Sequence, residues 1–154
     1  MIFYIKCIYS LSLPFIFNII EYYVHKLSHN PKFKILYNDH HLHHLEYPPS
    51  RLTIKKNTIT MSDTRKVYII SYVISIILLS KVLSYDYFMI LIQESTIYGM
   101  IINILHNCYH LEDSRIHKYA WFKRLQENHH NHHREPHKNF NLIIPLCDII
   151  NKTI

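Results

Sequence analysis

The chain has 154 residues, which limits it to a single domain covering residues 1–154. Its hydrophobic content of 49% and aromatic content of 14% exclude a disordered protein. The net charge of +6 is not accompanied by a basic–aromatic module of known type, so we expect no nucleic-acid partner. The three cysteines form no CxxC pair, which argues against a disulfide framework or a thiolate zinc site and favours a role as small apolar filler.

The first apolar stretch covers residues 2–24 and is interrupted by Lys6, Pro14 and Asn18. It predicts either one membrane-spanning helix with a proline kink or two shorter interfacial pieces. The amino terminus has no basic region followed by a small-residue cleavage site, so we expect no removable signal peptide. We therefore expect the stretch to stay in the protein as an anchor.

Two further apolar segments, residues 67–83 and 87–105, are candidates for membrane spans. The intervening residues 84–86 predict a short turn, so the two segments should form a hairpin that crosses the membrane and returns. The second segment carries Gln93 and Glu94 at mid-depth, and Glu94 is either a polar residue facing other helices or a functional one. Because residues 67–79 are rich in β-branched side chains, a buried strand in a soluble α/β core remains the alternative for that segment.

Histidine is the most informative residue type, because ten of the 14 histidines fall into four clusters with a repeated spacing. Residues 25–29 and 106–110 each read HxxxH, and residues 40–44 and 129–133 each contain HxxHH. Imidazoles at i, i+3 and i+4 project from one face of a helix, so each cluster can present several ligands to one ion. Four such faces can enclose two ions.

The order of clusters and apolar segments predicts that all four clusters emerge on the same side of the membrane. Two clusters lie between the first apolar stretch and the hairpin, and the other two follow the hairpin's return. Fifteen of the 17 lysines and arginines lie in residues 26–66 and 115–152, on that same side. Basic residues are enriched in cytoplasmic loops, so we expect a multi-pass membrane protein with a cytosolic histidine face.

The ligand types narrow the metal but do not identify it. Neutral imidazole binds zinc, iron and copper. The chain has no thiolate site, and it has no Glu-x-x-His in register between clusters of the kind that soluble di-iron bundles use. Ten neutral ligands would hold two divalent ions in a cationic site with open positions for dioxygen. Spacing alone does not distinguish iron from zinc.

Several of these motifs resemble one family. The run Glu21-Tyr22-x-x-His25-x-x-x-His29 resembles the first motif of the fatty acid hydroxylase / sterol desaturase superfamily, and Asn38-Asp39-His40-x-x-His43-His44 resembles the second. The run from Trp121 to His133 resembles the last motif. Asn139-Phe140-Asn141 and Pro145-Leu146-Cys147-Asp148 resemble a closing stretch usually written Asn-Phe-Gly, then Leu-Trp-Asp and Gly-Thr. Asn141, Cys147 and Lys152 depart from that pattern, where the family has Gly, Trp and Gly.

The resemblance implies an all-α fold, with an amino-terminal apolar helix and a hairpin under a cytosolic helical cap that holds a dinuclear metal site. It implies two iron ions (zinc being possible in the isolated protein), O2 and electrons from a cytochrome b5-type or other donor, with the endoplasmic reticulum as the location in a eukaryotic cell. The implied reaction is oxidation of an unactivated lipid C–H bond, and no catalytic side chain beyond the metal ligands is invoked. Carried over by position, the ligands are His25, His29, His40, His43, His44, His106, His110, His129, His132 and His133.

Four histidines (His41, His117, His130 and His137) fall outside the motifs. If the motif were read one residue later, the spacing would be His41-x-x-His44 or His130-x-x-His133. His41 and His130 are therefore the alternative ligands. Asp39, Glu112, Asp113 and Glu127 are either acceptors that orient imidazoles or ordinary solvated charges.

The sequence therefore favours a membrane-bound di-iron hydroxylase of a lipid. The segment from Tyr47 to Leu52 is more similar to fatty acid hydroxylases than to sterol enzymes, which favours a fatty acyl substrate. A sterol or other lipid desaturase or oxidase of the same superfamily is the first alternative. Another alternative is a non-catalytic membrane zinc-binding protein. Such a protein would be expected to lack one or more of the metal ligands, and none is missing here. The last alternative is a soluble basic binding module.

Overall fold

The fold is all-helical over the residues described by this computed structural model, which are 2–55 and 65–154, with side chains described outside 65–71. The elements are α1 (Ile2–Ser28), α2 (Lys34–Glu46), α3 (Arg65–Leu79), α4 (Tyr85–Tyr109), a 3₁₀ turn η1 (Arg115–Lys118), α5 (Ala120–Arg134) and α6 (Leu146–Asn151). Extended pairing within these residues is limited to one isolated bridge between Ile54 and Leu111. The predicted all-α class is confirmed.

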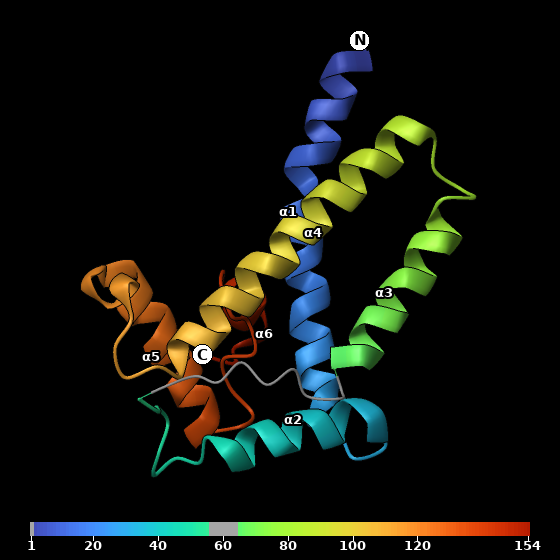
Figure 1. The fold of residues 1–154 in the computed structure, drawn as a ribbon. Helices are drawn as coiled ribbons and strands as arrows, with labels where there is room; N and C mark the ends of the chain where they lie inside the picture. Colours follow the sequence, from blue (N-terminus) through green and yellow to red (C-terminus); the bar gives the residue numbers. More distant parts are fainter. Residues whose placement is uncertain (1, 56–64) are drawn as a thin grey trace.

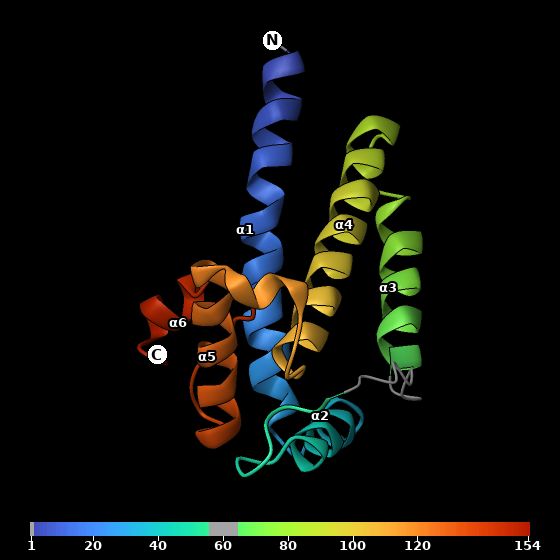
Figure 2. The same cartoon turned by 60° about the vertical axis from the view of Figure 1, so that its left-hand side comes forward.

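Helices α1, α3 and α4 stand side by side, α2 crosses beneath them, α5 packs against α4 and α6 packs against α1 (Figures 1 and 2). Because α3 returns the chain before α4 begins, α1 and α4 both run toward α2. Their carboxyl-terminal ends therefore reach the same layer as α2 and the end of α5. This arrangement confirms that the four histidine clusters lie at one end of the molecule.

The first apolar stretch forms one helix, which settles the choice between one helix and two pieces. Pro14 lies inside α1, where its ring nitrogen cannot donate to the preceding turn, yet the helix continues to Ser28. Pro31 follows the turn after this helix and cannot continue it.

The predicted hairpin forms between α3 and α4, but its boundaries differ from those expected. Helix α3 ends at Leu79 rather than at residue 83, and residues 80–84 make the turn, while Tyr85 already begins α4. At about 1.5 Å per residue, the 15 residues of α3 reach about 22 Å, which is shorter than a bilayer core. The strand alternative for residues 67–79 is wrong, because α3 covers them.

Two helices of the described part, α1 and α4, are long enough and apolar enough to cross a membrane. In their most apolar windows only 11% of α1 and 0% of α4 is buried inside the molecule. The central helix of a soluble protein would be mostly buried, whereas these apolar faces are uncovered by protein. The exposure therefore indicates membrane localisation.

Polar side chains join α1 to α4 along their length. Lys6 forms a 2.5 Å ion pair with Asp86 at one end, and the Ser10 hydroxyl donates to Glu94 further along. Near the histidine end, the Tyr98 hydroxyl donates to Glu21 at 2.7 Å. Pairing of this kind keeps polar groups out of lipid, and it accounts for Glu94 as a residue that faces a neighbouring helix.

The buried apolar core is small and lies where α1 meets Phe140 and α6, and where α4 meets α5. One cluster consists of Tyr22, Phe140 and Cys147, and the other of Leu105, Tyr109 and Phe122, with Cys108 packed against it. The two cysteines thus serve as small apolar packing residues, as predicted.

Candidate metal centre

Ten imidazoles from four helices converge where α1, α2, α4 and α5 meet. Their Nε2 atoms form two groups. Site A contains His25, His29, His40, His44 and His132, and site B contains His43, His106, His110, His129 and His133. Four residues of each group have ligand atoms within 4.8 Å of one another. His44 joins site A through contacts to His40 and His132, and His106 joins site B through His43.

The helical period explains how each cluster divides between the sites. The HxxHH cluster of α2 sends its i and i+4 rings, His40 and His44, to site A and its i+3 ring, His43, to site B. The cluster of α5 does the reverse, since His129 and His133 enter site B while His132 enters site A. Rings at i and i+4 lie nearly above one another, whereas i+3 is rotated toward the other side. Each site thus receives both rings of one HxxxH cluster, the two outer rings of one HxxHH cluster and the middle ring of the other HxxHH cluster.

The separations within each group fit ligands of a metal ion. In site A the Nε2 atom of His132 lies 3.1 Å from that of His25, 3.1 Å from that of His29 and 3.2 Å from that of His44. In site B, the Nε2 atom of His129 lies 2.8 Å from that of His110 and 3.1 Å from that of His133. Nitrogens bound at right angles to one ion at about 2.1 Å would lie about 3.0 Å apart.

Backbone carbonyls determine which nitrogen of four rings carries the proton. The Nδ1 atoms of His25 and His132 donate to the carbonyls of Phe140 and Lys138, at 2.5 and 2.7 Å. In site B, Nδ1 of His110 donates to the Leu52 carbonyl at 2.8 Å, and Nδ1 of His133 donates to the Tyr47 carbonyl at 2.8 Å. A carbonyl only accepts, so the neutral ring keeps an unprotonated Nε2 that points into the site.

This protonation pattern favours a cation between the rings. The Nε2 lone pairs of His25 and His132 face each other at 3.1 Å, and neither neutral ring has a proton left there to share. Two facing lone pairs repel one another, whereas a metal ion between them accepts both. The donor set therefore fits a metal in site A. In site B, His110 and His133 likewise have unprotonated Nε2 atoms, and they belong to a group whose ligand atoms lie within 4.8 Å of one another, so this donor set fits a metal as well.

Burial keeps these imidazoles neutral. It lowers the pKa of His29 and His110 to about 4, that of His44 to about 3 and that of His133 to about 2. Burial is the largest cause in each case, because a charged ring loses its hydration, and neighbouring rings add to it for all but His29. Neutral imidazole is the form that binds metals.

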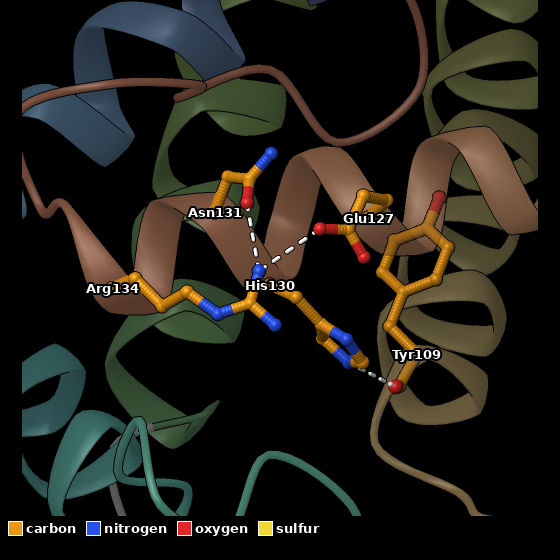
Figure 3. Close-up of polar contacts among 5 residues, drawn as sticks. All are labelled: Tyr109, Glu127, His130, Asn131 and Arg134. Atoms are coloured by element: carbon orange, nitrogen blue, oxygen red, sulfur yellow. Dashed lines mark hydrogen bonds and ion pairs between the residues drawn. The ribbon is translucent and has the colours of Figure 1, made fainter.

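The four histidines outside the motifs also lie outside both sites. His130 is buried on α5, but its Nε2 lies 2.9 Å from the Tyr109 carbonyl at the end of α4 and donates to it (Figure 3). His41 is exposed and stacks on Tyr37 at 5.3 Å. His117 belongs to the capping box of η1, and His137 is exposed beside Glu135. The alternative in which His41 or His130 replaces an adjacent histidine as a ligand is therefore not what the structure shows.

The carbonyls that hold the rings could not be seen in the sequence, because every residue has one. The carboxylates proposed as orienting groups are not what the four Nδ1 atoms contact. Glu127 instead pairs with Arg134 on the exposed face of α5 at 2.9 Å (Figure 3), and Glu112 and Asp113 are exposed. In the sequence Asp148 is only one residue of a motif, whereas in the structure it is a fully buried carboxyl group.

Three residues of the closing stretch differ from the family pattern, and each fits its surroundings in the structure. Asn141 stands in place of a glycine, and its side chain donates to the Asn18 carbonyl and accepts from the Cys147 amide. Cys147 packs where the pattern has tryptophan. Lys152 has φ of 55°, a left-handed conformation that favours the glycine of the pattern.

An open depression of about 510 Å³ lies next to site A. Its lining includes the ligand His29 together with Phe140, Lys26 and His137. Of the two sites, A is the less buried, since three of its four closest ligands are partly exposed whereas three of the four in site B are buried. Site A is thus the one nearer to solvent.

Comparison with known proteins identifies the family. A search of curated proteins and a search of solved structures each find no match to the chain. A model of one family, described as fatty acid hydroxylase, matches residues 10–153 and so spans all four histidine clusters and the closing segment. The chain therefore belongs to the fatty acid hydroxylase family.

Proposed function

We propose that the protein is a membrane-bound di-iron oxygenase that hydroxylates a C–H bond of a lipid, with a fatty acyl chain as the substrate. The observation that carries this proposal is the division of ten imidazoles into two groups of five at the end of the fold where α1 and α4 meet α2. Family membership supports the reaction class. Iron rather than zinc is proposed because lipid hydroxylation requires redox chemistry.

In this proposal the ten histidines hold the ions through Nε2, and the four carbonyl acceptors keep four of those nitrogens unprotonated. When bound, the metal pair would supply the oxidising chemistry of the net reaction R–H + O2 + 2 e⁻ + 2 H⁺ → R–OH + H2O. Because imidazole ligands add no negative charge, the site would favour acceptance of electrons from an external donor when metal is bound. We propose a donor of the cytochrome b5 type.

A lipid substrate suits the surroundings of the site. Helices α1 and α4 end at the metal centre, and their apolar faces are uncovered by protein. An acyl chain in the same bilayer can approach along these helices without entering water. The costly transfer of a long apolar chain out of lipid is thereby avoided.

Lipid profiling of cells tests the activity. We expect cells that produce the chain to accumulate lipids with one added oxygen, and His133→Ala to abolish this product while still inserting into membranes. His41→Ala is the matched control, because His41 is an exposed histidine outside both sites. Loss of two hydrogens would instead identify a desaturase. An unchanged lipid profile, together with tightly bound zinc in the purified protein, would refute the oxygenase proposal.

We further propose that the histidine end faces the cytosol, at the endoplasmic reticulum in a eukaryotic cell. Most lysines and arginines lie on the segments at this end, as the distribution of charge across membranes favours. A reporter fused after Ile154 should then be digested by protease added outside sealed microsomes. Protection of that reporter would reverse the proposed orientation.

A further inference from the structure

Asp148, in the first turn of α6, is a carboxyl group with 0% of its surface exposed. Its Oδ1 accepts from the Phe140 amide at 2.9 Å and from the Thr153 hydroxyl at 2.7 Å, and its Oδ2 accepts from the Asn141 amide at 2.8 Å. Burying a carboxyl group is costly unless its oxygens are bonded. A residue so placed, and so fully bonded, holds a particular piece of backbone in position.

The backbone that it holds is the closing segment, residues 138–148. Asn139 is in the left-handed conformation, with φ of 51°, and its amide donates to the Thr153 carbonyl at 2.6 Å. The Thr153 amide donates in turn to the Asp148 carbonyl at 2.9 Å. The bend at Asn139 is thus fastened on one side by Thr153 and on the other by the Asp148 carboxyl group.

This bend presents two carbonyls to metal-binding imidazoles of the same site. His132 donates to the Lys138 carbonyl and His25 donates to the Phe140 carbonyl, and both rings belong to site A. The corresponding acceptors of site B, the carbonyls of Tyr47 and Leu52, lie in the segment after α2. The two sites are therefore oriented by different loops.

From this separation we propose that Asp148 is a positioning residue that sets the metal affinity of site A and leaves that of site B unchanged. It acts through Phe140 and Lys138, whose carbonyls fix the ring orientation and protonation of His25 and His132. The proposal rests on the proposed function only in that both sites bind metal. Loss of a partner that orients a ligand typically weakens metal binding about 10- to 100-fold.

The test is a Co²⁺ titration of the detergent-purified, metal-stripped protein, followed by the cobalt absorption bands. The parent chain should bind two equivalents. In Asp148→Asn one carboxylate oxygen becomes an NH2 group, which cannot accept from the Phe140 or Asn141 amide. We expect this variant to bind one equivalent as tightly as the parent and the second about 10- to 100-fold more weakly.

Two backgrounds identify which site has changed. His110→Ala removes a ligand of site B, so adding Asp148→Asn to it should weaken the binding that remains. His132→Ala removes a ligand of site A, so adding Asp148→Asn to it should change the remaining affinity little. Glu127→Gln alters an exposed carboxylate of α5 and serves as the control with unchanged binding.

Should Asp148→Asn fail to fold, Thr153→Val removes one bond to the carboxyl group and keeps its two amide partners. We expect a smaller weakening that is again confined to site A. Equal weakening of both sites, or no weakening in folded protein, would overturn the positioning role alone. A parent chain that binds no cobalt would overturn the metal centre itself, and with it the proposed function.

Discussion

At the scale of single residues, neighbouring histidines of α5 have different tasks. His129 points into site B, whereas His130, one position later, donates to the last carbonyl of α4 (Figure 3). One residue corresponds to a rotation of about 100° around the helix, so adjacent rings leave it in different directions. The carbonyl of Tyr109 is one of the groups at a helix end that lack a partner within the helix, and His130 and Gln126 both donate to it.

Replacing these two histidines should separate stability from metal binding. We expect His130→Ala to keep the full metal content and to lower the free energy of unfolding by about 1 kcal/mol, because Gln126 still donates to the Tyr109 carbonyl. His129→Ala should lose metal from site B. Metal analysis and thermal unfolding in detergent measure both effects, and loss of metal from the His130 variant would show that His130 is a ligand.

Lys152 offers a stabilising substitution. A non-glycine residue in the left-handed region carries a steric cost of about 1–2 kcal/mol. Lys152→Gly removes that cost, and the greater freedom of glycine in the unfolded chain offsets part of the gain. We expect a net increase in stability of about 0.5–1 kcal/mol, seen as a higher melting temperature.

A matched substitution within a helix should have the opposite sign. Lys123→Gly lies in α5, where glycine costs about 1 kcal/mol. A melting temperature that falls in both variants would show that the left-handed conformation at Lys152 is not strained.

At the scale of elements, Glu21 ties three parts of the molecule together. It lies on α1, accepts from the Tyr98 hydroxyl of α4 at 2.7 Å and accepts from the Leu142 amide of the closing segment. Nearby, Asn18 of α1 donates to the Ile144 carbonyl at 2.9 Å. Helices α1 and α4 and the closing segment are thus joined by polar bonds.

We expect Glu21→Ala to lower the stability of the detergent-purified protein by about 2 kcal/mol or more, because it leaves a hydroxyl and an amide without their acceptor. Glu127→Ala is the control, since an exposed pair such as Glu127–Arg134 contributes about 0–1 kcal/mol. Thermal unfolding of both variants measures the difference. Equal melting temperatures would mean that the junction at Glu21 contributes no more than a surface pair.

At the scale of the whole molecule, the metal centre lies where four helices meet, and the apolar core there is small. Ions that bind only the folded chain would stabilise it by mass action, by about 4 kcal/mol at 1,000 times the dissociation constant. We expect a chelator to lower the melting temperature and Fe²⁺ to restore it. A melting temperature that is insensitive to chelator in metal-loaded protein would contradict this linkage.

Helical spacing and side-chain chemistry were enough to predict several features of the fold and site from the sequence. They include one end for all four clusters and the helical faces on which the ten histidines lie, whereas the all-α class was implied by the family resemblance. The end of α3 was misplaced, because Ser80 and Lys81 interrupt an apolar run that hydropathy reads as continuous. The orienting groups were missed as well, since backbone carbonyls leave no mark in a sequence.

The sequence by itself determined the helical register of the histidines, because spacing is a local property, and the resemblance of its motifs to one family predicted ten of them as ligands. Only the tertiary structure decided how they divide into two groups of five, and that Asp148 supports one group through residues 138–148. His25 and His132 are 107 positions apart in the chain. Their meeting depends on how α1 and α5 pack, which no local pattern contains.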